Sequence, residues 1–167
     1  MMAPLEPPDA LHQKAAEGWI GLGDYAAAND ELEQISTANR GHPDVLQLLW
    51  RIQANAEKWG ACLDIATTLT TITPERRFGW IHRAHSLHKL GRTQEAKDLL
   101  LSVTNRFQSS PTIPFHLARY SCALGHSQEA LDWLEKAVAA ADNPETLIRL
   151  RKQVLEDPAL EPLRKKL

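Results

Sequence analysis

The sequence predicts an all-α fold in which antiparallel helical hairpins stack in a row. Apolar residues recur at spacings of three and four along most of the chain, which is the period of one face of a helix. This pattern itself recurs every 34 residues, and a fixed period of roughly 20 to 50 residues is typical of stacked repeats. Proline and glycine also stand at breaks between the periodic runs, where helices end and begin.

The clearest hairpin covers residues 77–108. Trp80, Ala84 and Leu87 share one face of its first helix. Gly91 follows, and glycine ends a helix there because it adopts the left-handed backbone conformation at low cost. Thr93 is the predicted N-cap of the second helix. The apolar face of that helix consists of Ala96, Leu99, Leu100 and Val103. Such a hairpin cannot bury both faces alone, so we expect a neighbour on each side.

Those neighbours are found by shifting the hairpin by 34 residues. Four copies follow one another without insertion or deletion, at 9–42, 43–76, 77–110 and 111–144. The second helices align small residues at Ala28, Cys62, Ala96 and Ala130. The copy at 43–76 departs from the others, because a large Trp50 replaces alanine while a small Ala66 replaces leucine, and the two changes offset each other in volume. Proline marks the boundaries at Pro43, Pro74, Pro111 and Pro144.

The pattern changes at both ends of the chain. Residues 1–8 have no period, and we expect them to be disordered or frayed. Residues 145–167 predict a capping helix and a short terminal segment. Leu147, Leu150 and Val154 form one face of this helix, whose polar outer face would close the end of the stack. Leu160 and Leu163 follow in the short segment, which we expect to fold back on the array.

The repeat resembles that of tetratricopeptide-repeat proteins, over about 140 to 160 of the 167 residues. The signature residues are Trp80, Ala84, Leu90-Gly91 and Ala96 in the third copy, with Pro74 before it, and Trp19, Gly23 and Ala28 in the first copy. The resemblance implies a right-handed superhelical solenoid of four hairpins plus a capping helix. It also implies a protein–protein interaction scaffold or adaptor that binds a peptide or helix in a concave groove lined by the first helices.

Exposed positions of the first helices predict the groove residues. The first helices at 77–90 and 111–124 contain Arg and Lys but no Asp or Glu. Arginine and aromatic side chains dominate interface energies, so such a groove would suit an acidic peptide with an apolar anchor. The alternative is that the arginines are solvated surface charges and that the apolar members pack between hairpins. The predicted groove residues are Gln47, Arg51, Phe78, Ile81, His85, His88, Phe115 and Arg119.

Other functions find less support in the sequence. The chain has 19 basic and 21 acidic residues and no apolar run long enough to cross a membrane, so we expect neither nucleic-acid nor membrane binding and take a cytoplasmic location as the default. His82, His85 and His88 stand three residues apart, a spacing that turns their rings away from a shared metal ion. No catalytic motif is present, so we expect no enzyme activity and no cofactor. The groove also lacks the lysine and asparagine set with which co-chaperones of this family hold a C-terminal carboxylate.

Two further hypotheses stay open. His85 and His88 could gain charge between about pH 5 and 7 and so strengthen the binding of an acidic peptide. The chain could instead be a structural self-assembly module, a weak homodimer formed through Trp133 or through the end faces, or an accessory domain of a larger complex.

Overall fold

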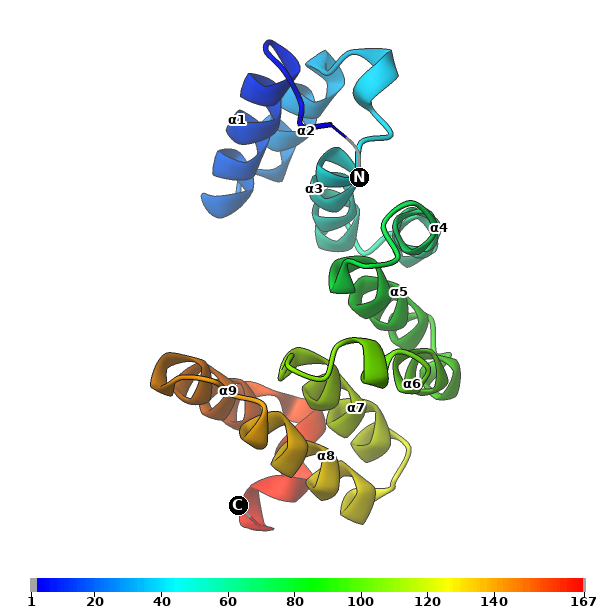
Figure 1. Ribbon diagram of the computed structural model, residues 1–167, viewed down its shortest axis with the longest axis vertical. Helices are drawn as coiled ribbons and strands as arrows, with labels where there is room; N and C mark the ends of the chain where they lie inside the picture. The colour runs from blue at the N-terminus through cyan, green and yellow to red at the C-terminus, as the bar shows by residue number, and fades with distance from the viewer. Residues whose placement is uncertain (1–2, 167) are drawn as a thin grey trace. The chain divides into compact units, whose positions relative to one another are not determined.

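The computed structural model describes residues 3–166, and the described chain is all-α (Figure 1). Three 3-10 segments accompany the α-helices: η1 (Thr37–Asn39), η2 (Thr104–Arg106) and η3 (Pro158–Lys166). The α-helices are α1 (Asp9–Gly21), α2 (Tyr25–Gln34), α3 (Pro43–Asn55), α4 (Trp59–Ile72), α5 (Arg77–Lys89), α6 (Thr93–Leu101), α7 (Thr112–Ala123), α8 (Ser127–Ala139) and α9 (Pro144–Glu156). The chain forms two compact units, Met1–Ser86 and Leu87–Leu167, which are described separately below.

The first helix of each pair ends in the same backbone turn. Gly23, Gly91 and Gly125 have positive φ angles of 81°, 79° and 81°. The amide that follows each glycine donates to a carbonyl five residues back, at 2.8 to 2.9 Å, which is the long bond of a Schellman motif. Glu57 occupies the equivalent position in the pair of α3 and α4 with φ 54°, although it carries a side chain.

One local prediction differs from the structure. Thr93 is the first residue of α6, and Arg92 is the N-cap without a capping side-chain bond. The Thr93 hydroxyl instead lies 3.0 Å from Nδ1 of His88, which belongs to α5. The hydroxyl therefore bonds to a side chain outside α6 and does not cap this helix. Residues 1–8, which we expect to be disordered or frayed, are described from residue 3 onward, and residues 1 and 2 lie outside the described part. Leu5 packs against the core formed by α1, α2 and α3.

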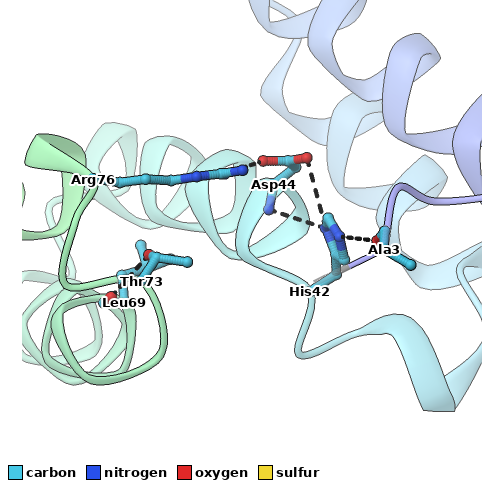
Figure 2. A network of polar contacts seen from close by, with 6 residues as sticks. All are labelled: Ala3, His42, Asp44, Leu69, Thr73 and Arg76. Carbon is cyan, nitrogen blue, oxygen red and sulfur yellow. Dashed lines mark hydrogen bonds and ion pairs between the residues drawn. The ribbon is translucent and has the colours of Figure 1, made fainter. Parts of the chain in front are cut away.

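Polar contacts hold the start of the first unit in place (Figure 2). His42 is the N-cap of α3, and its Nδ1 accepts the amide hydrogen of Asp44 at 3.2 Å. The opposite ring nitrogen, Nε2, donates to the carbonyl oxygen of Ala3 at 3.1 Å. Asp44 then forms an ion pair with Arg76 at 2.8 Å. The beginning of α3 is therefore tied both to the N-terminal segment and to the loop after α4.

Helices of the first unit meet at small residues. Ala16 of α1 and Ala28 of α2 are both fully buried in one apolar cluster with residues of α3. Trp50, Cys62 and Ala66 share the next cluster, so the tryptophan fills space beside two small side chains, as the sequence predicts. Gly79 of α5 approaches α4 so closely that a Cβ atom there would lie 2.9 Å from the backbone nitrogen of Thr70.

The second unit is built on α7 and α8, with α9 and η3 packed against them (Figure 1). An ion pair joins α6 to α8, since Lys97 Nζ lies 2.5 Å from the Glu129 carboxylate; the lysine side chain is 7% exposed and the glutamate side chain is 37% exposed. The two leucines of η3 are fully buried, which agrees with a terminal segment that folds back. The core of this unit contains Phe115, Ala118, Ala130, Leu134, Ala137, Leu150, Val154, Leu160 and Leu163.

We expect Glu57→Gly to stabilise the first unit by about 1 kcal/mol, because glycine removes the steric cost of the left-handed conformation while the turn keeps its hydrogen bonds. Gly91→Ala is the matched control and should destabilise the chain by a similar amount, because φ there is 79°. Urea unfolding followed by circular dichroism measures both. A loss of stability in Glu57→Gly would show that the glutamate side chain contributes more than its backbone conformation costs.

Candidate functional site

An open cavity of about 450 Å³ lies between α7 and α9 in the second unit. Each helix contributes one face, because its lining residues recur at spacings of three and four. Phe115 of α7 and Leu150 of α9 provide apolar surface, and both are also members of the buried core. The remaining lining is polar and of both charge signs. It consists of Thr112, His116, Arg119, Thr146, Arg149, Gln153, Glu156 and Asp157, together with Pro111 and Pro158.

Arg119 is committed to a partner within the chain. Its Nε forms an ion pair with a carboxylate oxygen of Asp157, and the two side chains are 19% and 12% exposed. The other carboxylate oxygen of Asp157 accepts the amide hydrogen of Ala159 at 2.9 Å. Arg119, one of the predicted groove residues, therefore has its charge paired within the chain while it also lines the cavity. The physical reason is that the end of α9 brings an acidic residue directly opposite α7.

Extending the 34-residue period into α9 finds residues of the cavity that the sequence prediction missed. Thr112 corresponds to Thr146, and Phe115 corresponds to Arg149. Arg119 corresponds in the same way to Gln153. All of these line the cavity. The helix was predicted as a cap with a solvated outer face, whereas it also continues the rows of the first helices.

Two apolar members of the predicted groove are core residues. Ile81 is 7% exposed and Phe115 is 6% exposed. This burial favours the alternative, in which these side chains pack inside the protein, although one surface of Phe115 still borders the cavity. The remaining groove residues of the first unit are more accessible. Arg51 is exposed, and Gln47, Phe78 and His85 are half-buried.

Aromatic rings surround the histidines of α5 in the first unit. The ring centroid of His82 lies 3.9 Å from that of Trp50 and 3.8 Å from that of Phe78. Burial between these rings, with smaller contributions from nearby His85 and Arg51, lowers the pKa of His82 to about 3. His85 makes edge contacts with Trp50 and Trp59, at centroid distances of 6.0 and 5.5 Å. His82 is thus a neutral aromatic packing residue at physiological pH.

The surroundings of His88 disfavour its charged form. Burial, followed by the positive charges of Arg119 and Lys89, lowers the pKa of His88, and Asp157 offsets part of this effect. Its ring lies 5.1 Å from that of Tyr120, within the second unit. Protonation of His88 is therefore less favourable than for an exposed histidine, and pH sensing by His88 stays a hypothesis.

No cluster of three or more His, Cys, Asp or Glu residues is arranged to hold a metal ion in the described part of the chain. Among the helices of residues 3–166, none has the length and apolar character needed to cross a bilayer.

Comparison with known proteins establishes the fold. No family model matches the sequence, and no curated protein matches it. TTC0263, a thermophilic tetratricopeptide-repeat protein of Thermus thermophilus, superposes with a TM-score of 0.73 at 20% identity over 95% of this chain and 96% of that chain. YrrB, described as having an unusual peptide-binding site, gives 0.67 at 15% identity over 87% and 75%. Cut9 in its complex with Hcn1 gives 0.71 at 16% identity over 89% and 30%. The chain has the tetratricopeptide-repeat fold.

The low pKa of His82 predicts a pH dependence of stability. Its pKa is about 3 in the folded chain and near 6.5 when unfolded, so only the unfolded state takes up a proton between these values. Stability should therefore fall as the pH is lowered from about 6.5, with a slope approaching about 1.4 kcal/mol per pH unit from this residue.

The matched variant is His82→Leu, since leucine stands 34 residues earlier at Leu48. Urea unfolding at several pH values between about 4.5 and 7.5 should give a shallower slope for the variant than for the original chain. The carboxylates are the same in both proteins, so the difference between the two slopes of stability against pH gives the contribution of His82. Equal slopes would mean that the pKa of His82 is the same in the folded and unfolded chain, which contradicts the lowered value.

Proposed function

We propose that this chain is a non-enzymatic protein–protein interaction scaffold that docks a segment of a partner protein in the cavity between α7 and α9. Proteins of this fold are typically interaction modules, and of the structures compared above one is described with a peptide-binding site and another as a complex. The observation that carries the proposal is the cavity itself. Its volume of about 450 Å³ is within the range of ligand pockets.

The lining favours a peptide with an acidic group and an apolar anchor. Phe115 and Leu150 supply apolar contact at the base of the cavity. Arg149 is exposed on α9 and lines the cavity, and its guanidinium is the type of group that pairs with a carboxylate. Thr112, Thr146 and Gln153 offer hydroxyl and amide groups that can bond to an extended peptide backbone. Arg119 contributes less free charge than the sequence suggests, because Asp157 already neutralises it.

The first unit supplies its own candidate contacts. Arg51 and Gln47 on α3, with Phe78 and His85 on α5, remain proposed partner-binding residues of the four-repeat array. The repeats proposed for this array are 9–42, 43–76, 77–110 and 111–144. Each range contains one observed pair of α-helices.

A second candidate function is self-assembly through the end of the second unit. Val138 of α8 is 45% exposed, and Leu155 of α9 is 64% exposed. They border an apolar hollow of about 400 Å³. Trp133 suits this role less than the sequence suggests, because Lys136 covers its ring at 4.0 Å. Light scattering at several protein concentrations tests this candidate function. A concentration-dependent dimer that Leu155→Glu abolishes would support self-assembly, and a monomer at all concentrations would contradict it.

Peptide selection tests the scaffold proposal directly. We expect peptides selected from a random displayed library to be rich in Asp or Glu next to large apolar residues. Arg149→Glu should weaken the binding of a selected peptide by roughly tenfold or more, because it places two like charges in contact. Fluorescence polarisation with a labelled peptide measures this change.

Lys152→Glu is the matched control, since it makes the same charge reversal on an exposed side chain of α9 outside the cavity lining. Its effect should be a small, salt-dependent weakening. If both variants weaken binding equally, only the total charge matters and the cavity is not the docking place. If the library yields no binder, the proposal fails.

A further inference from the structure

The terminal segment η3 presents one chemically distinct face to the rest of the second unit. Asp157, Leu160 and Leu163 are spaced by three residues. A 3-10 helix has three residues per turn, so Leu160 and Leu163 stand above one another in η3, and Asp157 directly precedes this helix as the C-cap of α9. Leu160 and Leu163 are fully buried, whereas Glu161 and Pro162 on the remaining surface are exposed.

Each member of this face has a defined receptor on the other helices. Asp157 forms its ion pair with Arg119 of α7. The two leucines enter an apolar cluster with Phe115 and Ala118 of α7, Leu134 of α8 and Val154 of α9. A carboxylate followed by two apolar anchors is the chemistry that the α7–α9 cavity favours, and Asp157 and Pro158 themselves border that cavity.

The segment has little structure of its own to hold it there. It is nine residues long, whereas 3-10 runs beyond three or four residues are uncommon because their hydrogen bonds are poorly aligned. Pro158 and Pro162 contribute no amide hydrogen. Its order therefore depends on the ion pair and the two leucines, and these are contacts that another chain segment can supply.

We propose that the segment Asp157–Leu163 is an internal copy of the ligand, and that a partner segment with an acidic residue followed by leucines three and six positions later binds by displacing it. The receptor is the surface of α7, α8 and α9 that now holds Asp157, Leu160 and Leu163. Displacement extends the docking place proposed above and so rests on that proposed function. While η3 is in place, its covalent attachment gives it an effective concentration of about 1 mM or more, so it weakens the binding of any competing peptide.

A labelled peptide with the sequence of residues 157–164 tests this proposal by fluorescence polarisation with the full-length chain. Asp157→Asn in the chain removes the charge of its own segment and leaves both leucines in place. We expect this variant to bind the peptide roughly tenfold more tightly than the original chain, because the internal competitor is weakened. Glu161→Gln removes the same charge from an exposed position of the segment and should bind like the original chain.

Changes in the peptide test the receptor contacts. Replacing its aspartate with asparagine, or both leucines with alanine, should abolish binding to the Asp157→Asn chain. The proposal is overturned if the altered peptides bind as well as the original one, if the Asp157→Asn and Glu161→Gln chains bind equally, or if neither chain binds the peptide.

Hydrogen exchange in the unmodified chain keeps the test decisive if Asp157→Asn proves unstable. A large excess of unlabelled peptide should accelerate exchange of the amides from Leu160 to Arg164 and leave those of α8 unchanged. Unchanged exchange of the segment overturns the displacement. The two proposals separate clearly: library peptides that depend on Arg149 while the 157–164 peptide fails would support the docking cavity and reject the internal ligand.

Discussion

The structure depends on the close approach of paired helices at residues that have almost no side chain. Ala16 of α1 and Ala28 of α2 are completely buried in one apolar cluster, and Ala118 of α7 and Ala130 of α8 are completely buried in another. Larger apolar residues surround the alanines in each cluster. Close packing at native density leaves no room for an extra methylene at such a contact. Trp50 breaks this pattern of small residues, and the small side chains of Cys62 and Ala66 in the same cluster leave room for its large ring.

Much of the fold could be predicted from the sequence because it depends on periodic, local information. The spacing of apolar residues, the 34-residue period and the glycines that end the first helices together predict helix pairs, and the all-α fold is confirmed. Glu57 shows the limit of such reasoning, since it adopts a glycine-like conformation that its side chain does not predict. The Thr93 cap was wrong by one residue, because the competing partner, His88, belongs to a different helix.

The site was less predictable because it depends on contacts between distant residues. The sequence places Phe115 and Arg119 on one face of α7, and that is correct, but it does not show that Phe115 is a core residue or that Asp157 lies opposite Arg119. A single sequence shows which residues share a face of a helix. Whether such a residue is buried or paired with a charge depends on which other helix packs against that face. Arg149 could have been predicted from the sequence, since it stands one period of 34 residues after Phe115. Counting the last helix as one more first helix would have included it.

Gly79 leaves the third hairpin without a side chain at a position where the neighbouring hairpins have one. The positions that correspond to it in the neighbouring copies are Val45 and Ile113, which are both buried, so the same place in the repeat is filled in those copies and empty here. The gap is taken up by the backbone of α4, which passes within contact distance of any added Cβ atom. A side chain such as that of Val45 or Ile113 would therefore not fit at position 79 without a shift of the α4 backbone. The hairpins share a period and a turn, but they are not interchangeable parts.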